Sequence, residues 1–134
     1  MLDNYWVLLV LKHELSFLES GGYHGGRRPF PALIFQDSPT CPNVARRARM
    51  RPCSECALAR FVPVQRRFKP AACRYIRLND AGETLESLYR TATQAEIEAA
   101  VSTWLRRTVA RLEEDLRRKE DQMHGCELGF GPVP

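Results

Sequence analysis

The sequence lacks any long apolar run, which bears first on membranes. Its longest strongly apolar stretch is WVLLVL, at residues 6–11, whereas a helix that crosses a bilayer needs about 20 apolar residues. The first residues also lack the features of a secretory signal peptide. Asp3 stands where a basic residue is expected, and no small-residue cleavage site follows. We therefore expect a cytoplasmic protein with no membrane contact.

Catalytic motifs are also lacking. The sequence contains no glycine-rich phosphate loop, no His-Glu-x-x-His pair and no nucleophile elbow. The glycines of GGYHGG, at residues 21–26, lack the preceding strand and following helix that a phosphate loop needs. Most carboxylates lie in stretches with a helical pattern and alternate with arginine, as they do on a solvated face. We therefore expect a protein that is not an enzyme.

Acidic residues are scarce in the middle of the chain. Residues 27–77 hold eleven Arg and one Lys against two acids, a net charge of +10, whereas residues 1–26 carry −2 and residues 78–134 carry −4. The planar guanidinium suits phosphate, and the aromatic side chains interleaved with these arginines can stack on bases. This stretch is therefore expected to bind nucleic acid or an acidic protein surface. The alternative is a solvated face, or one that Glu113, Glu114 and the other helical acids fold back to neutralise.

The residues expected to contact the acidic partner share one property, a positive charge inside this basic stretch. They are Arg27, Arg28, Arg46, Arg47, Arg49, Arg51, Arg66, Arg67 and Lys69. A face of this kind should bind in a salt-dependent way, because each phosphate that it neutralises releases counterions.

Four of the five cysteines lie in the same basic stretch, with the spacing Cys41-x11-Cys53-x2-Cys56-x16-Cys73. Disulfides are rare in the cytoplasm, so metal ligands or free thiols are expected. Two thiolates three positions apart in a tight turn can point at one ion, while more distant segments supply the other ligands. We predict that the four cysteines converge on one centre per chain. That centre is either a zinc ion, with each sulfur about 2.3 Å away, or a [4Fe–4S] cluster.

Other interpretations of the cysteines stay open. The thiols could simply be buried in the core, or Cys53 and Cys56 could form a redox dithiol, although the βαβ context typical of that motif is absent. His24 is a candidate to replace one cysteine ligand, and Cys126 lies outside the group, in HGCELG.

The order of the ligands bears on the choice of metal. A zinc ribbon usually has two Cys-x-x-Cys knuckles, whereas here one pair stands between two single cysteines. This order is similar to the ligand order of the WhiB-like regulators and the iron–sulfur helicases. The resemblance covers only the order and implies a cluster; the spacings differ, and the glycine–tryptophan motif of WhiB-like proteins is missing. Zinc accepts loose spacing, so both metals remain candidates.

Helical patterns stand on both sides of the basic stretch. Residues 4–19 carry an apolar stripe, with Asp3 or Asn4 as cap and two glycines after the end. TQAE, at residues 93–96, is a capping box, and a long helix should follow it to about residue 122. Its stripe is close to heptad spacing and consists of Ile97, Val101, Trp104, Leu105, Val109, Leu112 and Leu116. Gly125 is expected to stop the helix.

These patterns predict one domain of the α+β class over residues 1–134. Its parts are an N-terminal helix in residues 1–20, a basic four-cysteine module in 27–78, a helical segment in 84–122 and a flexible tail in 123–134. The module should bind its metal, contain short strands and lie between the two packed helices. The strands are expected at residues 32–35, 61–64 and 74–78.

Two alternatives to a nucleic-acid-binding protein follow from the same patterns. The heptad-like seam of the C-terminal helix also suits an interaction subunit, docking on a larger complex or on a second copy of the chain. An iron–sulfur cluster on the four cysteines also suits a small redox carrier or sensor.

Overall fold

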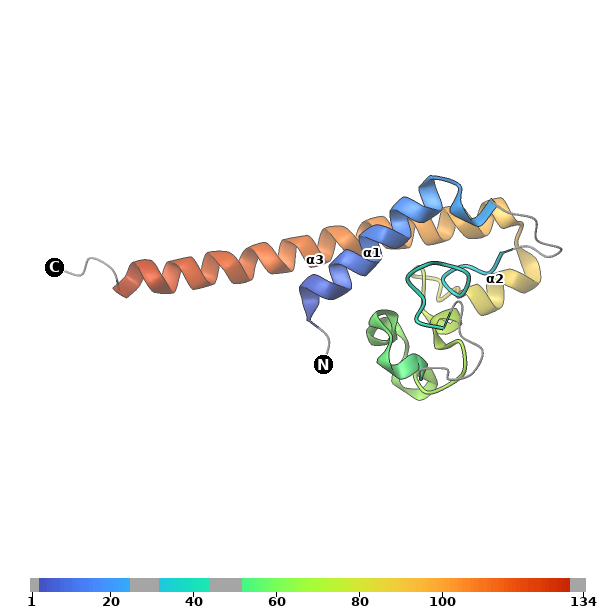
Figure 1. The fold of residues 1–134 in the computed structure, drawn as a ribbon, viewed down its shortest axis with the longest axis horizontal. Coiled ribbons are helices and arrows are strands. Elements are labelled where there is room, and N and C mark those ends of the chain that lie inside the picture. The colour runs from blue at the N-terminus through green and yellow to red at the C-terminus, as the bar shows by residue number, and fades with distance from the viewer. Residues whose placement is uncertain (1–2, 25–31, 44–51, 131–134) are drawn as a thin grey trace.

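The computed structural model describes residues 3–24, 32–43 and 52–130, with side chains as far as residue 123. Its longest element is α3, Gln94–Phe130, against which α1, Asn4–Glu19, lies (Figure 1). The short helix α2, Leu85–Thr91, directly precedes α3. Between α1 and α2 the chain forms 3-10 turns at Gly22–His24, Cys53–Glu55, Ala57–Phe61, Val64–Arg66 and Ala72–Tyr75. No helix in these ranges is long and apolar enough to cross a membrane.

The predicted α+β class is wrong, because the described residues are helical and contain no strand. All three expected strands fall on turns or on chain without a ladder. Their backbone groups bond locally; for example, the Val62 N–H donates to the Ala59 carbonyl at 3.0 Å. Pro63 has no N–H to offer to a neighbouring strand. Apolar runs of four or five residues carry too little periodicity to decide between strand and turn.

The N-terminal helix begins and ends as the sequence predicts. The side chain of Asp3 caps α1 by accepting a hydrogen bond from the Tyr5 N–H at 3.0 Å. After Glu19 the chain turns through Gly21, whose φ of 80° lies in the left-handed region that favours glycine. The buried face of α1 includes Val7, Leu11 and Leu18, each at most 6% exposed.

The expected packing of the N-terminal helix on the long helix is confirmed. The two helices run antiparallel, as Figure 1 shows. Polar contacts join them at intervals of seven residues on each helix, namely Tyr5–Glu120, Lys12–Glu113 and Glu19–Arg106. Seven residues make nearly two helical turns, so the same faces of both helices stay in contact along the seam.

The long helix starts at its predicted capping box and ends later than predicted. The Glu96 N–H donates to Thr93 Oγ1 at 3.2 Å, and the Thr93 N–H donates to Glu96 Oε1 at 2.9 Å. The helix then continues through Gly125 to Phe130. A glycine inside a helix costs about 1 kcal/mol relative to alanine, which lowers the helix propensity at that point without ending the helix.

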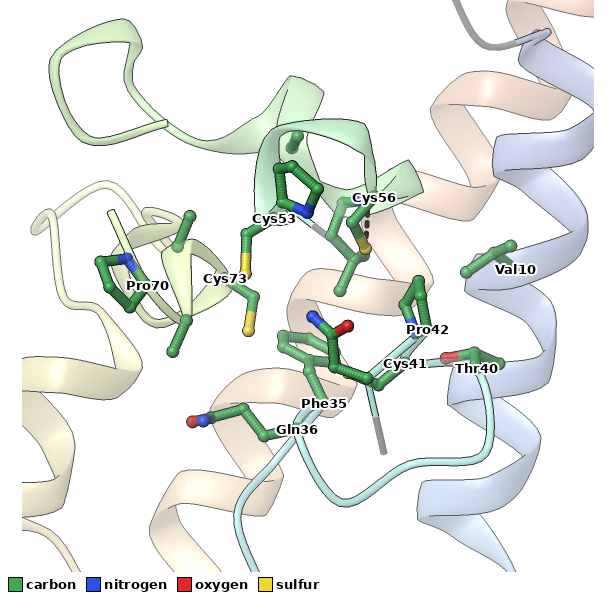
Figure 2. Close-up of a pocket in the computed structure, with 16 residues that line it drawn as sticks. Val10, Phe35, Gln36, Thr40, Cys41, Pro42, Cys53, Cys56, Pro70 and Cys73 are labelled. Carbon is green, nitrogen blue, oxygen red and sulfur yellow. Dashed lines mark hydrogen bonds between the residues drawn. The ribbon is translucent and has the colours of Figure 1, made fainter. Parts of the chain in front are cut away.

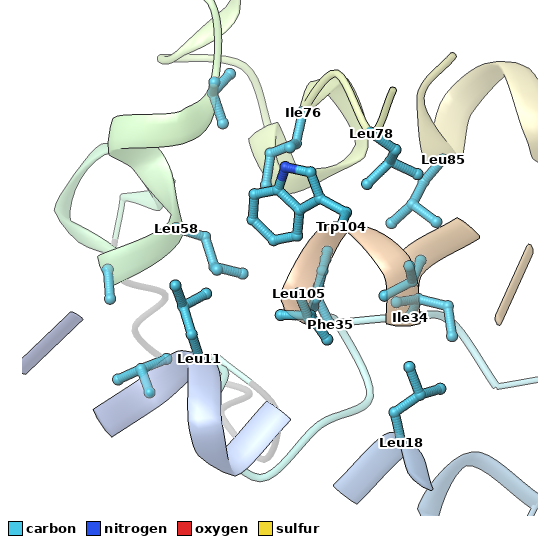
Figure 3. Close-up of a cluster of buried hydrophobic side chains, with 14 of the residues drawn as sticks. Leu11, Leu18, Ile34, Phe35, Leu58, Ile76, Leu78, Leu85, Trp104 and Leu105 are labelled. Carbon is cyan, nitrogen blue, oxygen red and sulfur yellow. The ribbon is translucent and has the colours of Figure 1, made fainter. Parts of the chain in front are cut away.

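One hydrophobic core joins the helix pair to the turns of the middle region (Figure 3). Trp104 of α3 is at its centre and makes edge-to-face contacts with Phe61 and Phe35, at ring-centre distances of 5.3 and 6.2 Å. Leu105 and Ile76 are at most 1% exposed. The middle region is therefore held against α3 by apolar side chains rather than by a sheet.

Candidate four-cysteine site

Cys41, Cys53, Cys56 and Cys73 line one pocket of about 260 Å³ (Figure 2). They come from three separate segments: the chain before residue 43, the Cys-x-x-Cys turn, and the turn Ala72–Tyr75. Each cysteine is partly buried and has a free thiol. The structure thus brings together the four residues that the sequence proposed as ligands.

The four sulfurs do not surround a single ion. In the part of the chain that the structure describes, no group of three or more His, Cys, Asp or Glu side chains is close enough to hold a metal ion. The prediction of a fold with a metal-bound middle region is therefore wrong, whereas metal binding by the four cysteines stays a prediction. Phe35, Leu58 and several prolines and alanines line the same pocket as the thiols.

The Cys-x-x-Cys pair lies on a tight turn. The Cys56 N–H donates to the Cys53 carbonyl at 3.1 Å, which closes the 3-10 turn. Cys56 also caps the next turn, since its Sγ accepts a hydrogen bond from the Leu58 N–H at 3.5 Å. Because Leu58 is only 4% exposed and belongs to the core, this N–H holds Cys56 Sγ in a fixed position.

Cys41 follows a segment that a buried carboxylate ties to α1. Glu14 is 1% exposed, and its oxygens accept hydrogen bonds from the hydroxyls of Tyr23 at 3.0 Å, Ser38 and Thr40. The Cys41 N–H then donates to the Ser38 carbonyl at 3.1 Å. Sequence reasoning missed Glu14. The available signal is its place in the apolar stripe of α1, where an acid interrupts the buried face.

Cys73 is held from the opposite side of the pocket. It lies two residues after Ala71, whose φ of 53° is unusual for a residue with a side chain. Its neighbour Ala72 is 1% exposed, and the Ile76 N–H donates to the Cys73 carbonyl at 3.4 Å. Core packing therefore fixes this turn as well.

The pocket favours neutral thiols. Burial raises the pKa of Cys41, Cys56 and Cys73, in the last case to about 12. Negative charge on the neighbouring thiols raises these pKa values further, whereas the Leu58 N–H lowers that of Cys56. Reactive thiols have a lowered pKa, so this environment does not favour a redox nucleophile. A bound metal reverses the effect, because it stabilises the thiolate form.

The structure describes three of the proposed partner-binding cations. Arg66 and Lys69 both lie over the ring of Tyr75, at 4.8 and 5.4 Å from its centre, and neither pairs with a carboxylate among the described residues. Arg67 instead turns inward and donates to the Val62 carbonyl at 3.0 Å. The remaining proposed cations lie outside the described residues: Arg27, Arg28, Arg46, Arg47, Arg49 and Arg51.

Two acids of the long helix make ion pairs with α1 or within α3 itself. Glu113 pairs with Lys12 of α1 at 2.9 Å, and Glu114 pairs with Arg117 one turn along its own helix at 2.8 Å. The face made by Arg66 and Lys69 is therefore not neutralised by these two carboxylates.

The other candidate ligand makes a different contact. His24 Nε2 lies 2.8 Å from the carboxylate of Glu98 on α3, and its side chain is 60% exposed. The side chain of Cys126 lies outside the described residues. Comparison with protein-family models, with curated proteins and with solved structures finds no match to this chain.

Proposed function

We propose that this chain is a non-catalytic cytoplasmic protein that binds one metal centre, a zinc ion or an iron–sulfur cluster, through Cys41, Cys53, Cys56 and Cys73. Its basic face binds nucleic acid. The pocket carries the proposal, because it gathers four thiols from three segments while the thiols remain free. Deprotonated cysteines are strong ligands for both zinc and iron–sulfur centres.

Metal analysis tests the first part. The full chain, purified without oxygen, is expected to carry metal, and Cys53→Ser is expected to lose most of it. The matched control is Cys126→Ser, which removes the one cysteine that is not among the four proposed ligands and is expected to keep the metal. Equal metal content in the two variants, or none in the unaltered chain, contradicts the proposal.

The basic face rests on the cluster of Arg66, Lys69 and Tyr75. The two cations share one aromatic ring, which attracts both of them through its negative face. Phe68, between them in sequence, is 82% exposed. Exposed cations beside an exposed aromatic ring suit a strand of nucleic acid, with phosphate on the cations and a base on the ring.

Salt dependence of binding tests the second part. The logarithm of the binding constant for single-stranded nucleic acid should fall linearly with the logarithm of the salt concentration. Each phosphate contact should contribute about −0.7 to the slope of that line. Replacing Arg66 and Lys69 by Ala should therefore flatten the slope by about 1.4 units. Replacing Arg46, Arg47 and Arg49 by Ala should flatten it by about two units.

The matched control is Arg107→Ala with Arg111→Ala, which removes the same charge from the exposed face of α3. It should leave the slope unchanged. Binding to an acidic protein but to no nucleic acid at low salt contradicts the choice of partner.

The C-terminal part of α3 favours a second candidate, self-association through this helix. Figure 1 shows α3 continuing past the N-terminal end of α1, and Met123, seven residues after Leu116 in the seam, is 65% exposed. Basic residues at 117–119 directly precede acidic residues at 120–121, so an antiparallel copy would meet opposite charge. Light scattering should then give a dimer that Met123→Glu converts to a monomer, and a monomeric unaltered chain contradicts it.

A further inference from the structure

The four cysteines line one space rather than converge on a point. All four cysteines line the pocket of about 260 Å³, yet no three of them are close enough to hold one ion. Figure 2 shows Cys53 and Cys73 on one side of this pocket and Cys56 on another. A zinc ion would require sulfurs about 2.3 Å from one centre, and hence about 3.8 Å from one another. Four sulfurs at that spacing would enclose no cavity.

The segments that carry these sulfurs are anchored independently. Glu14 ties the chain before Cys41 to α1. The Cys-x-x-Cys turn runs into the turn Ala57–Phe61, which packs on Trp104 through Phe61. Ala72 and Ile76, on either side of Cys73, are 1% exposed in the core. Drawing all four sulfurs onto one ion would move three packed segments, so the metal centre has to match the pocket.

The walls of the pocket are also compatible with a bound iron–sulfur cluster. They are mostly apolar and include Phe35, Leu58 and Val10. One backbone N–H, that of Leu58, already donates to a cysteine sulfur. Hydrogen bonds to sulfur and limited access of solvent are the means by which a protein holds an iron–sulfur cluster and sets its potential.

We propose that this pocket binds a [4Fe–4S] cluster, one iron to each of Cys41, Cys53, Cys56 and Cys73, rather than a single zinc ion. The inference rests on the proposed function, that these four cysteines bind a metal centre. In a cubane cluster each cysteine sulfur is bonded to its own iron, so the four sulfurs stand apart and the inorganic core fills the space between them.

Anaerobic reconstitution of the full chain tests the inference. The chain is incubated with equal amounts of ferrous and ferric iron and with sulfide, which together supply the oxidation state of a [4Fe–4S]²⁺ cluster without a further oxidant. The four thiols release their protons to the buffer. The expected result is about four irons and four sulfides per chain, with absorption near 400 nm.

Cysteine variants show which thiols bind the iron. Cys41→Ser and Cys73→Ser should each lose most of the bound iron and sulfide, whereas Cys126→Ser should keep both. Iron and sulfide are counted first on the unaltered chain. The inference can therefore still be tested if a variant fails to fold. A parallel sample receives zinc alone and is then challenged with a chelator.

The outcomes distinguish this inference from the proposed function. One zinc per chain that resists the chelator, with no uptake of iron and sulfide, overturns the cluster and leaves the four-cysteine site standing. Two irons per chain overturn the cubane in favour of a smaller cluster. A chain that retains neither metal overturns both proposals.

Discussion

Glu14 is a buried carboxylate whose hydrogen bonds all come from hydroxyl groups. Tyr23, Ser38 and Thr40 donate to it from two segments outside α1. Removing one partner from a buried polar network leaves the others unsatisfied, at about 1–3 kcal/mol per group. Glu14 is therefore a positioning residue for the segment that presents Cys41.

We predict that Glu14 makes stability depend on pH. Burial raises its pKa above the ordinary value of 4.5. At a pH between 4.5 and the folded pKa, the carboxyl group therefore keeps its proton in the folded chain and has lost it in the unfolded chain. The free energy of unfolding must then fall as pH rises from about 4.5 through the folded pKa. In Glu14→Gln this contribution is absent, so the stability of the unaltered chain minus that of the variant should fall across the same window.

Urea unfolding of the metal-free chain between pH 4 and pH 8 measures this difference. Glu113→Gln, at the exposed edge of α3, is the control for removing one carboxylate. The prediction is contradicted if the difference in free energy of unfolding between the unaltered chain and Glu14→Gln stays constant with pH.

At the scale of elements, the stability of α3 depends on the hydrogen bonds of its first turn. The capping box satisfies two N–H groups that have no partner within the helix, those of Thr93 and Glu96. Thr93→Ala should lower the free energy of unfolding by about 1 kcal/mol. Thr103→Ala, at an exposed position inside the same helix, should change stability little or raise it slightly, because alanine has the higher helix propensity.

Thermal and urea unfolding, followed by circular dichroism at 222 nm, compare the two threonine variants. Equal losses in both would show that the capping box contributes nothing specific. A larger loss in Thr103→Ala would contradict the argument outright.

At the scale of the whole molecule, the helix pair and the middle region differ in how they are held. The helix pair has a continuous seam with hydrogen bonds inside each helix, whereas residues 52–76 form only short 3-10 turns. Such turns have few and poorer hydrogen bonds, and regions of this kind open first. A bound metal centre links the turns and should suppress that opening.

Limited trypsin digestion checks this expectation. Removing the metal should increase cleavage after Arg60 and Arg66 before it increases cleavage after Arg106 or Arg107 on α3. Mass spectrometry of the first fragments gives the order of cleavage. First cuts within α3, or a rate that does not respond to metal removal, would contradict the prediction.

Much of the helical part of this fold is predictable from the sequence by itself. The caps at Asp3 and Thr93 and the seam from Ile97 to Leu116 are local signals, because each depends on residues within a few turns of one another. The choice of the four cysteines as one group is likewise readable from their spacing, since the structure places all four at one pocket.

Only the tertiary structure decided what lies between the helices. The runs at 61–64 and 74–78 have no decisive period, so their packing against Trp104 and α3 makes them turns rather than strands. The separation of the sulfurs depends on how three segments are anchored, and one anchor, Glu14, is distant in sequence from every cysteine. Spacing along a chain shows which ligands can meet, but the distance at which they meet is set by the packing of the segments that carry them.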